Sequence, residues 1–257
     1  YGRISTLLPL SYFSGTGPMA RTFADMAMMQ NVIAGRTPEE PATLPQLEMP
    51  LDYPGIKDMR IAYSPNLGLL PIDKDTRRGL EMALGVLRNL GAKVDEVKID
   101  PGFTADDLME LFSMGALGGA MGGLLAELVD QTDQMTPYAA YFVKKAASGK
   151  YGPSELYKFE TVVKDFYARM ANTVFENGFD ALITPTLATS HVPADFDFTK
   201  DSFTLEGQKM VGFFIGALTV PWNLLNWCPV VGAPAGISSQ GMPVGMQIIG
   251  KPYADLK

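Results

Sequence analysis

The stretch that decides the fold is Gly17-Pro18-Met19-Ala20-Arg21-Thr22-Phe23-Ala24-Asp25 with its continuation to Gly35. Thr22 and Asp25 stand three residues apart, which is the spacing of a capping box with Asp in place of Glu or Gln. The apolar residues that follow recur near helical spacing, and Gly35 can adopt the left-handed backbone that often ends a helix. The stretch therefore predicts a capped helix, with Arg21 and Asp25 spaced to pair across one turn.

This stretch and three later blocks resemble motifs of the amidase signature family. The family carries a Gly-Pro-Met-Ala-Arg-Thr-x-x-Asp segment, followed later by a Thr-Pro-Thr strand, a Pro-Phe-Asn run and a Gly-Leu-Pro-Val-Gly hairpin. The similar blocks here are Phe179-Asp180-Ala181-Leu182-Ile183-Thr184-Pro185-Thr186, Pro221-Trp222-Asn223-Leu224-Leu225-Asn226-Trp227-Cys228-Pro229 and Gly241-Met242-Pro243-Val244-Gly245-Met246-Gln247-Ile248-Ile249-Gly250. They stand in family order. The resemblance implies an α/β fold, in which helices cover both faces of a mixed β-sheet.

The first residues, Tyr1-Gly2-Arg3-Ile4-Ser5, resemble the inside of a family motif. We therefore interpret residues 1–257 as a single domain, the C-terminal part of an amidase signature domain that is incomplete at its N-terminal side. The resemblance implies that the parent protein hydrolyses a carboxamide to a carboxylate and ammonia or an amine. Members of the family use a serine nucleophile, a second serine at a cis peptide bond and a lysine, all in the N-terminal half.

The sequence does not contain the family's catalytic stretch, since no Gly-Gly-Ser occurs in it. A serine hydroxyl is a poor nucleophile until a positioned base removes its proton. We therefore expect the chain to be inactive by itself, and we predict no catalytic residue, cofactor or metal site in it. The resemblance does imply six substrate-binding residues along the acyl pocket: Thr184, Thr186, Trp222, Asn223, Asn226 and Trp227. The alternative is that the tryptophans are core anchors and the asparagines satisfy buried backbone.

Composition narrows the class of partner. The net charge is −7 without a basic cluster, which argues against nucleic acid as a partner. The single cysteine, Cys228, excludes an internal disulfide and fits a reducing, cytoplasmic location. The uncharged run 111–126 is short for a membrane span and predicts a buried or broken helix. We expect a small-molecule amide as substrate, no membrane partner, and self-association through apolar surface that a missing half leaves exposed.

The patterns also predict the order of elements. A proline-rich connector over 36–58 leads into a β-helix-β unit, with a strand over 59–64, a helix capped by Asp73 or Asp75, and a strand over 92–99. That unit implies parallel strands. The later elements are expected to be a helix over 153–177, a strand over 179–184, a polar loop over 188–207, a helix over 208–218, and strands over 229–233 and 244–249.

Other kinds of site are poorly supported by the sequence. Ser-His-Asp catalysis would require His191, the only histidine, with Asp195 or Asp197 as its orienting acid. A Cys228–His191 dyad is possible on paper, although a lone cysteine is more often part of a core. Residues 195–206 place acids in a calcium-loop frame, but Lys200 stands where the loop needs glycine.

Two functions of another class stay open. One is the amidase-type subunit of a tRNA-dependent amidotransferase, which would require a partner protein. The other is a non-catalytic binding or structural module, since a fold does not by itself fix a function.

Overall fold

The computed structural model describes residues 2–5, 15–211 and 216–256. They form a five-stranded sheet in the order β2-β1-β3-β7-β6 and a separate two-stranded hairpin, β4-β5. The strands are β1 (Arg60–Tyr63), β2 (Lys93–Glu96), β3 (Ala181–Pro185), β4 (Ser202–Leu205), β5 (Gln208–Val211), β6 (Val230–Ile237) and β7 (Pro243–Ile249). The helices are α1 (Phe23–Ile33), α2 (Lys74–Asn89), α3 (Leu108–Leu117), α4 (Ala120–Ala126), the 3-10 helix η1 (Val129–Gln134), α5 (Pro137–Ala147), α6 (Pro153–Thr173) and α7 (Val220–Leu224).

The sheet is mixed, as predicted. β1 pairs in parallel with β2 and with β3, whereas β7 runs antiparallel to both β3 and β6. The parallel β1–β2 pair confirms the β-helix-β unit, because parallel neighbours require a crossover, here through α2. The strands lie close to their predicted places, although β2 is shorter and β6 longer than expected.

Helix α2 covers one face of the sheet. Asp73 is its N-cap and accepts a hydrogen bond from the Thr76 amide at 2.6 Å, which decides between the two predicted caps. Leu80 and Leu84 are buried against residues of β1, β3 and β7. Leu90, the C-cap residue just after α2, is 59% exposed.

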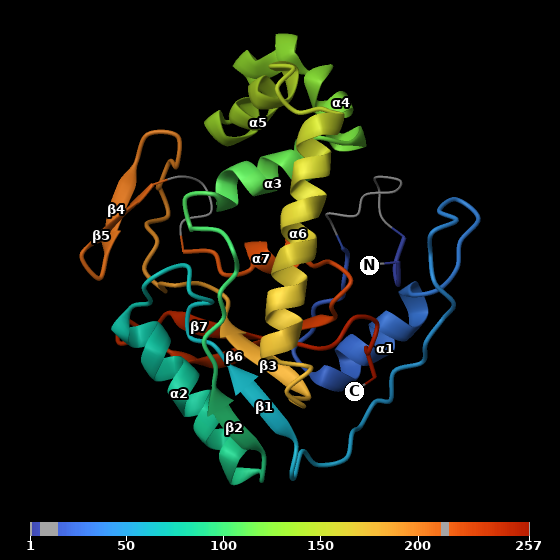
Figure 1. The fold of residues 1–257 in the computed structure, drawn as a ribbon, viewed down its shortest axis with the longest axis vertical. Coiled ribbons are helices and arrows are strands. Elements are labelled where there is room, and N and C mark those ends of the chain that lie inside the picture. The colour runs from blue at the N-terminus through green and yellow to red at the C-terminus, as the bar shows by residue number, and fades with distance from the viewer. Residues whose placement is uncertain (1, 6–14, 212–215, 257) are drawn as a thin grey trace.

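Helix α6 packs on the opposite face, and Figure 1 shows its lower, C-terminal end in front of the sheet while its other end reaches up to α4. Phe166 and Met170 of α6 are fully buried in a core that includes Leu182 of β3. The neighbouring residue on β3, Ile183, belongs to the core under α2. Successive strand residues point to opposite faces, so this alternation confirms a sheet covered by helices on both faces.

The uncharged run 111–126 forms a broken helix. α3 and α4 meet at an angle of 85° around Gly118 and Gly119. A Cβ at Gly122 would lie 1.8 Å from the Leu117 carbonyl oxygen, so the sharp bend requires glycine there. Among the described residues, no single helix has the length and apolarity to cross a membrane, and only the bent pair α3–α4 meets these criteria together.

The helix predicted over 208–218 is wrong: residues 208–211 form β5, and residues 216–218 form a turn in which Ala217 bridges to Leu187. The loop predicted over 188–207 is also interrupted, because β4 lies within it. Strands β4 and β5 pair antiparallel and project from the body of the molecule (Figure 1). Glu206 and Gly207 between them have φ values of 47° and 81°. Two positive φ values in a two-residue loop are the requirement of a tight hairpin turn, and this turn outweighs the helical appearance of the apolar residues. Residues 212–215 of the predicted helix lie outside the described residues.

Helix α1 begins as predicted. The Thr22 hydroxyl accepts from the Asp25 amide at 3.2 Å and donates to the Asp25 carboxylate at 2.7 Å. Asp25 is thus held by Thr22, and Arg21 forms no salt bridge in the described structure. Gly35 has a positive φ of 136° just after the helix. Only Ala27 of α1 is buried, and the exposed apolar side chains of the helix are Phe23, Met28, Met29, Val32 and Ile33.

Candidate functional site

A buried amide joins the strands that carry two of the predicted pocket residues. The Gln247 side chain of β7 donates to the Thr184 hydroxyl at 3.2 Å, the Pro185 carbonyl at 3.0 Å and the Leu218 carbonyl at 3.1 Å. Thr184 is fully buried, and Gln247 is 4% exposed. Thr186 is partly exposed and donates to the Gly245 carbonyl at 3.2 Å. The network fixes the end of β3 against β7 and against the approach to α7.

The other four predicted residues lie on α7 and just after it. Trp222 is 5% exposed and packs near Phe166, with ring centroids 6.4 Å apart. Its indole nitrogen is buried without a hydrogen-bond partner among the described residues. Asn223, Asn226 and Trp227 are partly exposed. The Trp227 ring packs edge-on against the Tyr167 ring, with centroids 6.1 Å apart. These four residues therefore combine one buried anchor with three side chains that reach the surface.

The N-terminal stretch comes close to this region. A Cβ at Gly15 would lie 2.9 Å from the Asn226 side-chain oxygen. Arg3 donates from two nitrogens to one carboxylate oxygen of Asp255, at 3.2 and 2.9 Å. Both members of this ion pair are about four-fifths buried, at 19% and 22% exposure. The fold therefore brings residues near the start and the end of the chain together beside the segment that follows α7.

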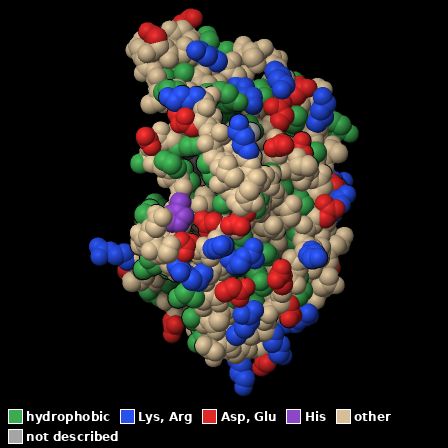
Figure 2. Space-filling view, turned by 90° about the vertical axis from the view of Figure 1, so that its left-hand side faces the viewer, with side chains coloured by type: hydrophobic (Ala, Val, Ile, Leu, Met, Phe, Trp, Pro, Cys, Tyr) green, Lys and Arg blue, Asp and Glu red, His purple; other side chains and the backbone are tan. Residues whose placement is uncertain are grey.

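His191 belongs to a cluster that the sequence did not predict. Its Nε2 lies 3.1 Å from Asp75 Oδ2, and the Ser239 hydroxyl donates to the same oxygen at 2.6 Å. Arg78 pairs with the other oxygen of Asp75 at 2.8 Å. Chiefly because of the Ser239 hydrogen bond, the pKa of Asp75 falls to about 2. His191, purple in Figure 2, lies at the surface next to carboxylates.

The cluster is not a catalytic triad. In a triad, histidine lies between the serine and the acid and accepts the serine proton. Here Asp75 lies between Ser239 and His191, so the serine hydroxyl donates to a carboxylate whose low pKa makes it a poor base, and His191 is not placed to take the proton. The acid on His191 is also Asp75 and not the predicted Asp195 or Asp197. The cluster instead ties α2 to the β6–β7 turn and to the segment after β3.

A serine and a lysine meet between α3 and α5, but in an unreactive arrangement. Lys145 Nζ donates to Ser113 Oγ at 2.7 Å, and the Ser113 hydroxyl itself donates to the Met109 carbonyl at 2.7 Å. Burial would lower the pKa of Lys145, but the neighbouring Tyr151, Tyr141 and Glu110 outweigh it and raise the pKa. Ser113 is completely buried. A protonated lysine cannot accept the proton of a buried serine, so this pair serves packing.

Cys228 and the acidic loop carry no reactive group either. Burial raises the pKa of the Cys228 thiol to about 12, so the thiolate that a Cys–His dyad requires does not form near neutral pH. In the loop, Asp197 accepts from Thr199 and pairs with Lys200 at 3.4 Å. Within the described ranges, no group of three or more His, Cys, Asp or Glu side chains is placed to hold a metal. The cytoplasmic location stays a prediction.

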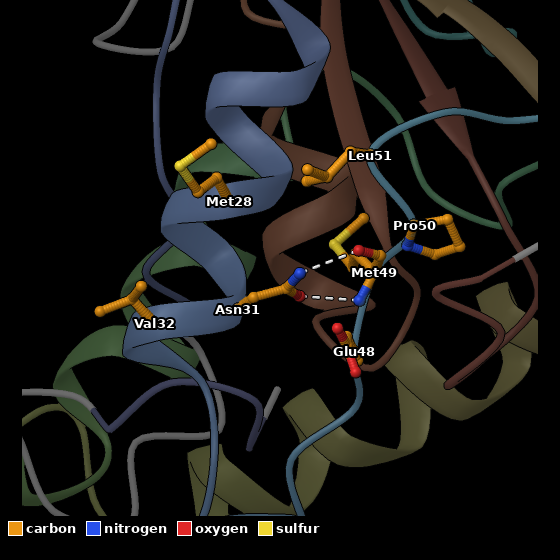
Figure 3. Close-up of a pocket in the computed structure, with 7 residues that line it drawn as sticks. All are labelled: Met28, Asn31, Val32, Glu48, Met49, Pro50 and Leu51. Carbon is orange, nitrogen blue, oxygen red and sulfur yellow. Dashed lines mark hydrogen bonds between the residues drawn. The ribbon is translucent and has the colours of Figure 1, made fainter.

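An open groove of about 560 Å³ lies beside α1 (Figure 3). Met28 and Val32 of α1 line one side, and residues 48–51 of the connector line the other. Asn31 lies between them and binds both the amide and the carbonyl of Met49, at 2.7 and 2.8 Å. None of the six predicted pocket residues lines this groove, so it is a surface feature separate from them.

Comparison with known proteins decides the family. The sequence profile of the Amidase family matches residues 8–257. The chain belongs to the amidase family. An acylamidase of Rhodococcus erythropolis is 28% identical over 243 residues, which cover 93% of this chain and 49% of that protein. A glutamyl-tRNA(Gln) amidotransferase subunit of Geobacter sp. (strain M21) is 25% identical, over 99% of this chain and 56% of that protein.

Solved structures confirm the amidase signature fold. A bacterial aryl acylamidase of the amidase signature family superposes with a TM-score of 0.78 at 20% identity, over 99% of this chain and 54% of that chain. The native peptide amidase of Stenotrophomonas maltophilia gives a TM-score of 0.70 at 19% identity, with the same coverage. The chain thus spans about half the length of the relatives that it matches.

Sequence reasoning overlooked Gln247 and Asp75. The available signal for Gln247 was a single amide side chain in the otherwise apolar run from Val244 to Ile249. For Asp75, the signal was a second acid in the first turn of the helix. Because Asp73 caps the helix, Asp75 can bind other partners. Neither signal identifies its partners, which lie 63 and 116 residues away in the cases of Thr184 and His191.

Proposed function

We propose that this chain is the C-terminal part of an amidase that hydrolyses a carboxamide to a carboxylate and ammonia or an amine. The observation that carries this proposal is the family match over residues 8–257, in a chain that spans only about half of its relatives. In this proposal a serine, a second serine at a cis peptide bond and a lysine perform the chemistry. All three lie in the remaining part of the amidase domain.

The hydrogen bonds of the described serines support an inactive chain. Ser239 and Ser113 each contact an ionisable side chain, but one hydroxyl donates to a carboxylate and the other to a backbone carbonyl. Activation requires a positioned base whose pKa is high enough to take the hydroxyl proton. Asp75, with a pKa of about 2, and the Met109 carbonyl are both poor bases, so we propose that both serines are structural.

The proposed acyl pocket lies along α7 and the segment that follows it. Asn223, Asn226 and Trp227 are partly exposed there and are the candidates for direct contact with substrate. Thr184 is fully buried under Gln247, so its proposed role is to position the end of β3. Trp222 lies beneath the same segment with an unsatisfied indole N–H. Two tryptophans favour a bulky aromatic or aliphatic acyl group.

The proposal is tested by assaying the purified chain against a panel of aryl and alkyl carboxamides. We expect no hydrolysis above the rate of buffer alone. Ser239→Ala and Ser113→Ala are the matched variants, because these hydroxyls are the ones that contact ionisable groups. Amide hydrolysis by the chain that either substitution abolishes would overturn the proposal.

A second candidate function is that of a subunit of glutamyl-tRNA(Gln) amidotransferase. The observation that favours it is the repeated match to such subunits, at 25–28% identity over 97–99% of this chain. The protein would then require glutamyl-tRNA(Gln) and partner proteins for activity. Amide hydrolysis by the whole protein that is independent of tRNA would favour the amidase, and strict tRNA dependence would favour the amidotransferase.

A further inference from the structure

An asparagine–glycine pair stands where helix α6 turns into β3. Asn177 is the only asparagine of the chain that precedes a glycine, whereas each of the others precedes a bulky or β-branched residue. Asn177 and Gly178 are both exposed, and Gly178 has a positive φ of 79°. Because glycine has no Cβ, its backbone nitrogen can approach the side-chain carbonyl carbon of the preceding asparagine with little steric hindrance. The pair therefore meets the sequence requirement for spontaneous deamidation.

The Asn177 side chain closes the end of α6. The last four carbonyl groups of a helix have no partner inside the helix. Two of them, at Asn172 and Thr173, accept from the Asn177 side-chain nitrogen at 3.0 and 3.1 Å. The Glu176 amide donates to a third, the Ala171 carbonyl, at 2.9 Å. The side-chain amide of Asn177 is thus bound to the end of the helix.

The backbone around Asn177 is hydrogen-bonded as well. The Gly178 amide donates to the Phe175 carbonyl at 3.1 Å. The Asn177 carbonyl accepts from Arg60 Nη1 at 2.8 Å. Arg60 begins β1, and its guanidinium carbon lies 4.6 Å from the centre of the Phe179 ring, where the cation is attracted to the aromatic face. Arg60 therefore stabilises the turn between α6 and β3 from a neighbouring strand.

We propose that Asn177 is a deamidation site whose reaction rate is set by local opening of the α6–β3 turn. In the reaction, the Gly178 nitrogen loses its proton and attacks the side-chain carbonyl carbon of Asn177. The new N–C bond closes a succinimide ring, the bond from that carbon to Nδ2 breaks, and ammonia leaves with the transferred proton. Water then opens the ring at either of its carbonyl groups and gives aspartate or isoaspartate.

The folded turn keeps both reacting groups in hydrogen bonds. The bond to the Phe175 carbonyl retains the proton on the Gly178 nitrogen, and the two helix carbonyls bind Nδ2, which is the leaving group. The reaction requires that these bonds break. A turn at the end of a helix opens locally at a lower free-energy cost than global unfolding, and the Arg60 hydrogen bond raises that local cost. The rate at Asn177 therefore follows the opening of the turn.

Deamidation would in turn weaken the end of α6. A carboxylate has no N–H to donate to the Asn172 and Thr173 carbonyls, and it adds a negative charge at the helix C-terminus, where the helix dipole is negative. Val174 and Phe175 beside it are part of the core. We expect Asn177→Asp, which reproduces one of the two products, to lower the thermal midpoint by about 2–4 °C.

The test follows deamidation of the purified chain at mildly alkaline pH by peptide mapping with mass spectrometry. One sample is kept in native buffer and the other in urea at a concentration that unfolds the chain. In urea, we expect Asn177 to react faster than every other asparagine. In native buffer, the reaction at Asn177 should be at least about tenfold slower than in urea, because the turn must open first.

Arg60 offers a variant that changes the turn and leaves both reacting residues intact. Arg60→Met keeps an unbranched side chain near Phe179 but removes the donor to the Asn177 carbonyl. We expect it to speed deamidation in native buffer by about three- to tenfold, as the loss of one hydrogen bond would, and to leave the rate in urea unchanged. Arg77→Met is the matched control, because Arg77 is exposed in the first turn of α2. It should change neither rate.

Three results would overturn the proposal. The first is another asparagine that reacts before Asn177 in urea, and the second is an equal rate at Asn177 in native buffer and in urea. The third is a native rate that Arg60→Met leaves unchanged while hydrogen exchange shows that the interior of α6 is still folded. The comparison of native buffer with urea requires no variant, so it decides the proposal even where Arg60→Met does not fold.

Discussion

The two edge strands of the sheet, β2 and β6, differ in charge and in exposed apolar surface. β2, at one edge, carries Lys93, Asp95 and Glu96, all exposed, and Lys93 pairs with Asp58 at 3.2 Å. β6, at the other edge, has eight uncharged residues and exposed valines. Charged side chains on an edge strand oppose pairing with other chains, whereas apolar ones invite it.

The same difference extends to the helices. α2, which packs over β6 and β7 and reaches β2, buries Leu80 and Leu84. α1 turns Met28, Met29 and Val32 to solvent and buries only Ala27. Figure 2, which shows the side of the molecule away from α1, has charges of both signs spread over that face. The edge of β2 thus carries charges that oppose pairing, whereas the edge of β6 and the outer face of α1 carry exposed apolar side chains that fit a partner.

The largest effect on stability should come from truncating a buried leucine of α2, and truncation of an exposed valine of α1 serves as the comparison. Leu84→Ala empties a fully buried site and should lower the free energy of unfolding by about 2–5 kcal/mol. Val32→Ala, on the exposed face of α1, should change it by less than about 0.5 kcal/mol. Urea denaturation of the two variants makes the comparison. A large loss for Val32→Ala would show that α1 is already packed in this chain.

A smaller loss should follow from breaking the link between the open side and the rest of the sheet. Gln247→Leu leaves the Pro185 and Leu218 carbonyls without their buried donor and should cost about 1–3 kcal/mol. Thr184→Val removes a single partner of Gln247 and should cost less. Urea denaturation measures both variants. Equal stability of Gln247→Leu and the wild type would show that the network does not hold β7 to β3.

Sequence reasoning recovered what local periodicity encodes. The apolar stripe of α6 and the Asp73 cap of α2 were both predictable, because each depends on residues within one or two turns. The hairpin β4–β5 was not, since residues 208–211 lead into an apolar run and resemble the start of a helix. The hairpin depends on the positive φ values of Glu206 and Gly207, and the sequence only hints at them through the glycine.

The candidate site was harder to predict for a physical reason. Family motifs named Thr184 and Trp222, and the structure brings their segments together through Gln247 and Leu218. The motifs did not show that both side chains are buried, because burial depends on what packs over them. The Asp75–Ser239 contact joins residues 164 positions apart, and no local pattern encodes a pair at that distance.

Acid should weaken the attachment of α2 to the β6–β7 turn through Asp75. Its pKa is about 2 in the folded chain, below its ordinary value of 3.8, so it binds protons more weakly when folded. The stabilisation is present above the ordinary pKa and is lost as pH falls from about 4 to about 2. The thermal midpoint of the wild type should fall faster over that window than that of Asp75→Asn. Parallel pH profiles of the two proteins would contradict this role.

The smallest effect on stability should come from exchanging the charge of the two edge strands, which is also the most direct test of the comparison. Val231→Lys places a charge on β6, and Asp95→Val removes one from β2; both side chains are exposed, so each change should cost less than about 0.5 kcal/mol. Their effects on association should be opposite. We expect the wild-type chain to self-associate at high concentration, Val231→Lys to reduce that association, and Asp95→Val to increase it. Light scattering over a concentration series measures all three. A wild-type chain that stays monomeric throughout would show that the β6 edge is closed without a partner, and the contrast between the edges would then be one of composition alone.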